Sequence, residues 1–516
     1  MNAGPAPQPR AAMPPDKRRG WIAFSIMLPR IMQGIDTTIA NVALPYIGGN
    51  LSASQTQAAW VLTSYIVAAA IMMPLSGWLA GRFGIKYIYL LSVAGFTLAS
   101  ALCGSATGLT ELVLYRALQG ICGAGMVPLS QAVLLQTYPV ERHGQAMAIF
   151  GIGTIVGPIT GPVLGGWLTE NYSWRWIFYI NLPVGVIAAL GILFFIPETR
   201  RAHREAFDFF GFITLSVAVG AFQILLDRGE MRGWFGATEI WIEAAIAAVA
   251  LYLFVVHTMT VSGPSFLNRD LLKSPNYMAG IVLMFFLGGI MNGTLALLPT
   301  MLQSLLNYPV ITAGIVTAPR AFGTMVAMFV VARLINRIDG RLLILFGLVM
   351  TAAAQWQMTG FSLGMGMEPV ILSGLTQGFG IGCIFVPLNT LALSNLPRHI
   401  LTQGTALRSL LRNIGGSVGI AIFEAQIVQN TQVVHSRLVE ALRPDNPLAQ
   451  PPFLPAPYSL TAPSGITALN AEVTRQAEMV AYIDDFKLMM IIALCSMVLL
   501  LLVRRPRAVR AAAPAE

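Results

Sequence analysis

Charged residues are scarce in this chain of 516 residues. Asp, Glu, Lys and Arg together make up 11% of it, whereas hydrophobic residues make up 55%. A soluble domain carries roughly a quarter of its residues as charged side chains, because these cover the surface that faces water. Most of this protein's surface must therefore face something other than water, which argues against a soluble fold with a buried core.

Residues that bind metals or carry out catalysis are also scarce. The four cysteines lie in apolar segments without metal-ligand spacing, and the five histidines lie in loops or near helix ends. We therefore expect no metal site and no disulfide. No glycine-rich loop ends in Gly-Lys-Ser/Thr, so ATP is not the expected energy source. A membrane-embedded enzyme would need Asp, Glu or His clustered at one membrane face, and no such cluster occurs; we expect neither an enzyme nor a cofactor.

Long apolar blocks are what the chain does have. Blocks of about 18 or more uncharged residues are typical of membrane-spanning helices, so the fold class is an all-α integral membrane protein. The fourteen expected spans are 21–46, 58–79, 87–106, 111–134, 145–168, 176–196, 209–227, 240–260, 276–302, 312–334, 342–363, 369–393, 405–427 and 486–503.

Basic residues between these blocks predict the orientation. They fall on one side of the membrane when the number of spans is even, and the positive-inside rule makes that side cytoplasmic, with both termini on it. The net charge of +9 therefore reflects topology rather than nucleic-acid binding. The loop 428–485 lies on the opposite, periplasmic side and is expected to be partly ordered at best.

The chain repeats itself. Gln119 and Gly157 correspond to Gln377 and Gly415, because both pairs are 258 residues apart (377 − 119 = 415 − 157). Two parallel six-helix halves suit alternating access by rocking of one half against the other, rather than a channel. The expected organisation is a tail (1–20), a six-helix bundle (21–205), two inserted helices (206–262), a second six-helix bundle (263–503) and a tail (504–516).

Asp36 and Arg116 are the main candidates for proton coupling. Each lies inside an expected span, where an ionisable residue is costly and is therefore a functional candidate. Their repeat counterparts are Ile290 and Gly374, so each charge belongs to one half only. We expect Asp36 to bind and release a proton, and Arg116 to modulate the proton affinity of Asp36 or of a neighbouring acceptor. The alternatives are a permanently ion-paired Asp36 and an Arg116 that only braces a helix or extends its charge to the membrane surface.

The span 145–168 is rich in glycine and proline. Small residues at spacings of four allow close helix packing, and prolines kink a helix. We expect this run to form a sliding surface between the halves, although a single glycine could serve ordinary packing. Its members are Gly153, Gly157, Pro158, Gly161, Pro162, Gly165 and Gly166.

Several segments resemble the major facilitator superfamily, and within it the fourteen-span drug:proton antiporters of the EmrB/QacA type, most like the EmrB-type members. The resemblance covers Trp21 to Val503, and the segments that carry it are Gln33–Pro45, Leu112–Gly120, the run in 145–168, Trp174–Pro183 and Pro197–Thr199. It places Asp36 and Arg116 at the acidic and basic motif positions. It implies two six-helix bundles plus two inserted helices, proton-coupled drug efflux across the bacterial inner membrane, and a periplasmic adaptor with an outer-membrane channel as partners.

The segment 77–86 resembles the superfamily's cytoplasmic gating loop through Gly77, Arg82, Gly84 and Lys86. It departs from the family pattern at Gly81, where an acidic residue is usual, so the usual partner of the basic residues is missing within the motif.

Further arginines lie within expected spans and, with Asn41, are candidates for lining the substrate cavity: Arg30, Arg320, Arg408 and Arg412. Cations in a cavity should favour lipophilic weak acids or anions over permanent cations. The alternative is that these arginines face helix ends and the cytoplasm. A transporter of this kind could also export an endogenous metabolite, siderophore or lipid by the same mechanism.

Overall fold

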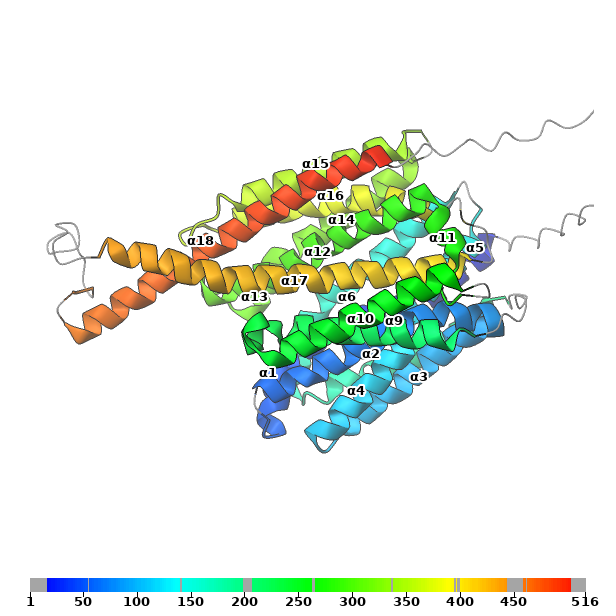
Figure 1. The fold of residues 1–516 in the computed structure, drawn as a ribbon, viewed down its shortest axis with the longest axis horizontal. Helices are drawn as coiled ribbons and strands as arrows, with labels where there is room; N and C mark the ends of the chain where they lie inside the picture. Colours follow the sequence, from blue (N-terminus) through cyan, green and yellow to red (C-terminus); the bar gives the residue numbers. More distant parts are fainter. Residues whose placement is uncertain are drawn as a thin grey trace, which may run out of the picture.

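The protein is a bundle of long helices in the computed structural model (Figure 1). The structure describes residues 16–53, 55–139, 142–197, 207–261, 265–335, 337–393, 396, 400–442, 458–460 and 462–502, and all regular structure within these ranges is helical. The expected tail 504–516 and most of the tail 1–20 lie outside the described residues.

Residues 16–197, here called the N-terminal half, form six long rods, two of which are interrupted. The helices are α1 (Asp16–Asn50), α2 (Gln55–Phe83), α3 (Ile85–Ser105), α4 (Leu109–Gly123), α5 (Met126–Thr137), α6 (His143–Asn171), α7 (Trp176–Tyr179) and α8 (Asn181–Phe195). By length and hydropathy, α4 with α5 and α7 with α8 each make one candidate membrane span.

Two helices follow the N-terminal half and pack against each other, α9 (Phe209–Gly229) and α10 (Thr238–Thr260). Two short 3-10 turns join them around Gly233, whose φ of 69° is a left-handed conformation that favours glycine. Asp208 caps α9 by accepting a hydrogen bond from the Gly211 amide at 2.9 Å.

Residues 265–502, here called the C-terminal half, begin with a short helix and again form six long rods. The helices are α11 (Arg269–Lys273), α12 (Pro275–Ser304), α13 (Val310–Thr317), α14 (Pro319–Leu334), α15 (Gly340–Met358), α16 (Glu368–Leu393), α17 (Leu401–Glu440) and α18 (Pro463–Val498), with a final 3-10 turn η5 (Leu499–Leu502). Proline is at or next to the first position of α12, α14 and α18, where its missing N–H costs nothing.

Each of the fourteen expected spans corresponds to one of these helices or to an interrupted pair. Within the part of the chain that the structure describes, eleven helical segments are long and apolar enough to cross a membrane. The remaining three expected spans fall on α1, α6 and α17, and α1 and α17 carry the arginines and the aspartate discussed below, which lower their hydropathy.

The same helix pairs pack in both halves. In the N-terminal half α1 packs along α6, and α4 packs against α2 and α3; in the C-terminal half α12 packs along α17, and α16 packs against α14 and α15. Between the halves, α2 contacts α17 and α6 contacts α14. This repeated pairing is the arrangement that the internal sequence repeat predicts.

Apolar contacts between the halves concentrate at the end of the bundle where α1 begins and α18 ends, here called the terminal end. The largest buried hydrophobic cluster includes residues of both halves, such as Tyr89 and Phe150 with Phe385. At the opposite end there are two separate clusters, one around Trp174 in the N-terminal half and one around Phe486 in the C-terminal half. The halves are therefore joined by apolar packing chiefly at the terminal end.

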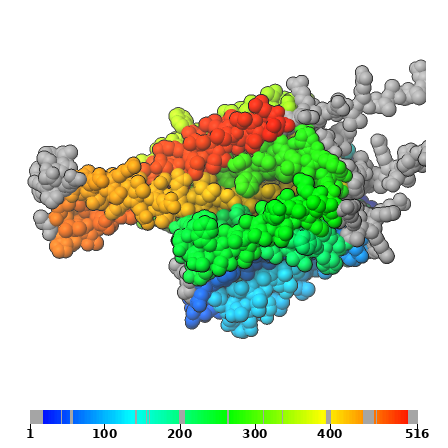
Figure 2. Space-filling model, in the orientation of Figure 1, coloured from blue at the N-terminus to red at the C-terminus, as the bar shows by residue number. Residues whose placement is uncertain are grey.

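The segment 428–485 differs from the expected loop. Residues 428–440 continue α17 and residues 463–485 belong to α18, so both are helical; residues 443–457 and 461 lie outside the described residues. The two helices project together beyond the rest of the bundle, at the left of Figures 1 and 2. We call residues 428–440 and 463–480 the stalk. Six of the seven prolines in 428–485 belong to the connection between the two helices, whereas most of the Asn and Gln residues lie within the helices.

Candidate functional site

Asp36 lies at the centre of a buried hydrogen-bonded cluster in the N-terminal half. Arg116 Nη1 donates to Asp36 Oδ2 at 2.7 Å, and the Nε2 of Gln119 and the Nδ2 of Asn181 each donate to Asp36 Oδ1 at 2.9 Å. The exposed fraction of all four side chains is 2% or less. Three donors, one of them the cation Arg116, therefore converge on this carboxylate.

Arg116 is held by more than its ion pair with Asp36. Its Nε donates to the carbonyl of Val61 at 3.1 Å, and Nη1 also donates to Gln119 Oε1 at 2.7 Å. The guanidinium lies 4.4 Å from the centre of the Tyr65 ring and 5.7 Å from that of Phe178. Planar stacking and several directed donors fix the orientation of an arginine in a way that lysine does not match.

Helix geometry brings these side chains together. Arg116 and Gln119 are three residues apart on α4, so they share one face of that helix. A side chain at Gly120 would collide with the backbone carbonyl of Tyr65, so this glycine lets α4 approach α2. Asn181 begins α8, where the interruption after α7 turns its amide toward α1; Asn181 also donates to Ser100 at 3.0 Å.

The sequence singled out Asp36 and Arg116, and the structure places them in direct contact. From the sequence alone, neither Gln119 nor Asn181 is assigned a role. Gln119 had a usable signal, because it lies one turn beyond Arg116 and recurs as Gln377 in the repeat. Asn181 lies in the segment Trp174–Pro183 that carries the family resemblance, but its contact with Asp36 becomes visible only in the folded protein.

The C-terminal half has a related cluster without a charge. Gln377, the counterpart of Gln119, donates to Thr294 at 2.8 Å, and Gln355 donates to the same hydroxyl at 3.2 Å. Thr294 lies one turn beyond Ile290, the apolar counterpart of Asp36, and donates to Met489 Sδ at 3.4 Å. The two halves thus share a scaffold, but only the N-terminal half places an ion pair in it.

Three of the candidate arginines, Arg30, Arg408 and Arg412, are cations without acidic partners among the described residues. Arg30 donates to Thr154 at 3.2 Å and Arg412 donates to Asn413 at 3.3 Å. Arg408 donates to Gln131 of the other half, while its Nε and Nη1 are buried and have no hydrogen-bond partner. Arg412 interacts electrostatically with both Arg30 and Arg408. Among the described residues, none of the three has a carboxylate within salt-bridge distance.

The two remaining candidates for the substrate cavity are placed differently. Arg320 is half-buried on α14 and its backbone contacts α16, where a side chain at Gly378 would collide with the Arg320 carbonyl. The side chain of Asn41 is exposed on α1, beyond Asp36. Neither residue belongs to the Asp36 cluster.

The expectation of a sliding surface formed by the glycine run is wrong for these glycines. Side chains added at Gly153, Gly157, Gly161 and Gly165 would meet α1 of the same half, at Met27, Gly34, Thr38 and Ile39 respectively, and one at Gly166 would meet nothing within 4 Å. Spacings of four residues put the first four glycines on one face of α6, and that face packs against α1. The side chains of Pro158 and Pro162 lie outside the described residues.

Other α6 residues meet the C-terminal half. Phe150 stacks on Phe385 with ring centres 6.3 Å apart. Side chains added at Gly144 and Gly151 would meet Ile335 and Met328 of α14 and its following turn. The beginning of α6 therefore contacts the C-terminal half through these residues, and α6 also packs against α13 and α16.

The segment 77–86 lies where the two halves meet. A Cβ added at Gly77 would lie 3.1 Å from the Cα of Gln403 in α17, so only a very small residue fits here. Gly84 has a φ of 99°, which strains any other residue. Arg82 lies 5.2 Å from the Trp78 ring centre, and Lys86 is half-buried. Nothing lies within 4 Å of a Cβ added at Gly81.

Asp208 forms a second polar junction, at the start of α9. Its carboxylate accepts hydrogen bonds from the amides of Gly211 and Phe266, both at 2.9 Å, and contacts His257 Nε2 at 2.9 Å. Burial alone would raise the pKa of Asp208, but these hydrogen bonds and the histidine outweigh burial and lower the pKa below its ordinary value.

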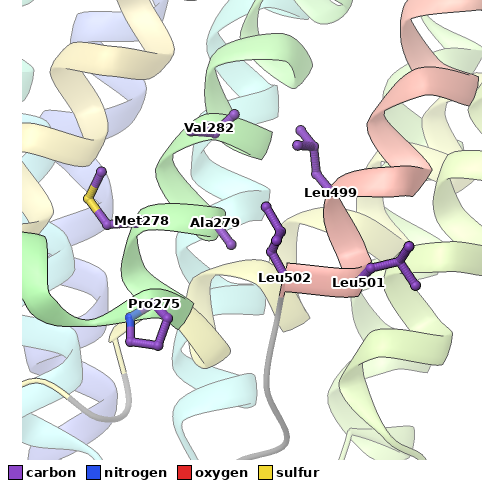
Figure 3. A pocket seen from close by; sticks show the side chains of 7 residues that line it. All are labelled: Pro275, Met278, Ala279, Val282, Leu499, Leu501 and Leu502. Carbon is purple, nitrogen blue, oxygen red and sulfur yellow. The ribbon is translucent and has the colours of Figure 1, made fainter.

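An apolar crevice with a volume of about 400 Å³ lies between the beginning of α12 and the end of η5 (Figure 3). It is lined by Pro275, Met278, Ala279, Val282, Leu499, Leu501 and Leu502. None of these side chains can hold a proton or pair with a charge. Among the described residues there is also no cluster of three His, Cys, Asp or Glu that could hold a metal ion. The Asp36 cluster is therefore the best-built polar site.

Comparison with known proteins agrees with this arrangement. Residues 26–420 match the family model described as Major Facilitator Superfamily. The chain is 36% identical over 452 residues to multidrug export protein EmrB of Escherichia coli strain K12, covering 87% of each protein. It is 35% identical over 430 residues to fatty acid resistance protein FarB of Neisseria gonorrhoeae, covering 82% of this chain and 84% of FarB.

Solved structures share the fold at low sequence identity. The human organic anion transporter MFSD10 (TETRAN) aligns with a TM-score of 0.60 and 13% identity, over 95% of this chain and all of that one. A bacterial homologue of the human lysosomal transporter Spinster, in an inward-facing and unoccupied conformation, aligns with a TM-score of 0.54 and 17% identity, over 96% of this chain and all of that one. From its helical repeat, its buried ion pair and these similarities, the chain belongs to the Major Facilitator Superfamily, among the EmrB-type transporters, and is not an enzyme.

Proposed function

We propose that the protein is a proton-coupled exporter of lipophilic compounds in the bacterial inner membrane, with fourteen spans and both termini in the cytoplasm. Relatives with 36% identity over most of the chain are named multidrug export proteins. The basic loops and the common end of α1 and α18 support the orientation. Protons are the coupling ion, and no other cofactor takes part.

The observation that carries this proposal is the fully buried Asp36–Arg116 pair, which has a neutral counterpart in the other half. With the halves packed together at the terminal end, Asp36 is ionised and paired. A proton that enters from the periplasmic side converts the carboxylate to a neutral acid and weakens its attraction to Arg116. Arg116 then keeps the Val61 carbonyl and Gln119 as acceptors. Release of the proton toward the cytoplasm restores the pair, and the cycle exchanges this proton for substrate.

Inverted membrane vesicles provide the direct test. Acidifying their interior should make native vesicles accumulate a lipophilic substrate, and Asp36→Asn vesicles should not. Asn retains the shape of the neutral acid, so the variant should still insert and fold. Counterflow, the exchange of labelled for unlabelled substrate without a gradient, should persist in the variant. Normal gradient-driven accumulation by Asp36→Asn would move proton coupling to another residue.

We further propose that lipophilic weak acids are preferred substrates. Two nitrogens of Arg408 are buried without a partner. Arg412 interacts electrostatically with both Arg408 and Arg30, and none of the three has an acidic partner among the described residues. An anion would satisfy these donors, whereas a quaternary ammonium compound would be repelled. The name of FarB, fatty acid resistance protein, also supports acidic substrates. In vesicles, Arg408→Gln should reduce transport of a fatty acid more than that of a neutral dye; equal loss for both would contradict this preference.

The stalk supports a periplasmic adaptor as partner, which in turn would join an outer-membrane channel. Valines at 428, 433 and 439 are about half exposed there, as is Ile466, and apolar side chains outside the bundle suit binding of another protein. Val433→Asp combined with Ile466→Asp should abolish drug resistance of cells while leaving transport in inverted vesicles unchanged. Full resistance of cells that carry this variant would show that the stalk is not the docking surface.

A further inference from the structure

A second buried carboxyl group lies in the C-terminal half, on α18. The exposed fraction of Asp485 is 0%, and neither of its carboxyl oxygens has a hydrogen-bond partner. Its neighbours on the same face of α18, Tyr482, Phe486 and Met489, all belong to the buried hydrophobic cluster of this half. An aspartate in such surroundings makes no polar contact that would stabilise the fold. A structural role therefore does not explain it.

Among the described residues, no cation lies within salt-bridge distance of Asp485. The adjacent Asp484 is paired with Lys487 at 2.8 Å, which occupies the nearest base on α18. Among the helices packed against α18, α12 carries no Asp, Glu, Lys, Arg or His, and α15 carries only Arg341 at its first turn. Besides Asp484, Asp485 interacts electrostatically with Tyr482, which itself interacts with Glu478 on α18 and Glu424 on α17.

Physical chemistry then fixes the charge state of Asp485 in this conformation. An ionised carboxylate without hydrogen bonds or a counter-ion costs several kcal/mol away from water, and a neutral acid costs far less. Asp485 therefore holds a proton here. Asp36 has the opposite surroundings, with one cation and two amide donors. The same conformation thus keeps one buried carboxyl ionised and the other neutral.

The position of Asp485 links it to the uncharged cluster of its half. Met489, one turn farther along α18, accepts the hydrogen bond of Thr294, on which Gln355 and Gln377 converge. The side-chain oxygens of both glutamines are buried without a donor. Helix α18 occupies in the C-terminal half the place that α8 occupies in the N-terminal half, where α8 supplies Asn181 to Asp36. The unpaired acceptors of α15 and α16 are therefore linked through Thr294 and Met489 to the helix that carries the unpaired acid.

We propose that Asp485 is a second proton-binding site, which holds a proton in this conformation and releases it when the helices around α18 rearrange during transport. The inference rests on the proposed proton-coupled export. It implies that two carboxyl groups change protonation in one cycle, so two protons accompany each substrate. The protonated Asp485 is the loaded form, and an ionised Asp485 requires water or a cation that reaches it in the opposite conformation.

Infrared spectroscopy tests the loaded form without any transport. The native protein in detergent at neutral pH should show the carbonyl band of a protonated carboxylic acid. Asp485→Asn should remove that band, and Asp484→Asn, which changes the adjacent ion-paired carboxylate, should leave it. The asparagine is close in shape to the neutral acid, so folding should be preserved. A native protein without this band, or a band that persists in Asp485→Asn, would overturn the proposal.

Vesicle accumulation tests release of the proton. With the membrane potential clamped, each coupled proton contributes about a tenfold concentration ratio per unit of pH gradient. Native vesicles should reach about 100-fold accumulation at a gradient of about one unit, and Asp485→Asn about tenfold, with Asp484→Asn like the native protein. Equal plateaus for native and Asp485→Asn would make Asp485 a permanently neutral residue and refute the site. Absence of gradient-driven accumulation by the native protein would instead refute the proposed function.

Discussion

At the scale of single residues, the ion pair of Asp36 and Arg116 dominates the chemistry. Both side chains are buried, and each also has neutral hydrogen-bond partners. A buried pair contributes little net stability, but removal of one partner leaves an uncompensated charge. The pair is therefore suited to a cycle in which protonation of Asp36 changes the local charge while the surrounding amides keep the geometry.

Removal of Arg116 should be destabilising only while Asp36 remains ionised. We expect Arg116→Ala to lower the free energy of unfolding by about 3–5 kcal/mol and to abolish proton-coupled transport. The double variant Arg116→Ala with Asp36→Asn should regain much of that stability, because no buried charge is left unpaired. Thermal unfolding in detergent of the native protein, both single variants and the double variant gives the coupling energy. Additive effects would mean that the two side chains do not interact energetically.

At the scale of helices, close backbone contacts depend on particular glycines. A Cβ at Gly157 would collide with the backbone of Gly34 and Ile35 in α1, whereas a Cβ at Gly166 meets nothing within 4 Å. We expect Gly157→Ala to destabilise the protein by about 1–3 kcal/mol, as overpacked cores do. Gly166→Ala, on the same helix, is the matched control and should unfold at the native temperature. Equal unfolding temperatures for both variants would contradict the close packing of α1 and α6.

The inserted helices depend on Asp208. Its pKa is lowered, so its carboxylate contributes stability above its ordinary pKa of about 4, and this contribution is lost as the pH falls through the lowered value. Between pH 5 and 8 the Asp208 carboxylate itself should remain ionised. Asp208→Ala removes the cap of α9 and should cost about 1 kcal/mol. Asp208→Asn keeps a cap but loses the charge facing His257, so its stability should lie between that of the native protein and that of Asp208→Ala. Hydrogen exchange of the α9 amides measures this loss of stability. Native-like protection of these amides in Asp208→Ala would disprove the role of Asp208.

Much of the helical arrangement is predictable from sequence, because membrane helices follow from apolar length and their orientation from basic loops. The helix ends at the stalk were not predictable in this way. The last expected span begins at residue 486, but α18 begins at Pro463. A helix can continue beyond the membrane into water as long as its own hydrogen bonds and its neighbour, here α17, support it. For this reason Asp485 was counted with the loop, although it is buried in the bundle.

The sequence also does not predict which neighbouring helix packs against a given helix face. The spacing of Gly153, Gly157 and Gly161 correctly predicts one close-packed face, but spacing contains no information on whether that face meets α1 or the other half. By contrast, the contact of Asp36 with Arg116 could be anticipated, because two opposite charges inside a membrane protein are strongly favoured to pair.

At the scale of the whole molecule, the halves are joined at the terminal end and have separate apolar clusters at the other. If this end is cytoplasmic, the conformation is closed to the cytoplasm. Alternating access then requires the contacts at Gly77, Gln131 and Phe150 to separate in each cycle. The contact of Gly77 with α17 is the most suitable of these for a cross-linking experiment, because a Cβ at Gly77 would lie 3.1 Å from the Cα of Gln403.

A disulfide across this contact should stop transport reversibly. In a background without the four native cysteines, Gly77→Cys with Gln403→Cys should form a disulfide on oxidation, because only residues this close can satisfy disulfide geometry. Gly81→Cys with Gln403→Cys is the control, since a Cβ at Gly81 has no neighbour within 4 Å. The oxidised first pair should lose substrate accumulation and recover it on reduction, while the control transports throughout. A cross-linked pair that transports at the native rate would mean that the halves do not separate at the terminal end, and rocking of the two halves could not be the mechanism.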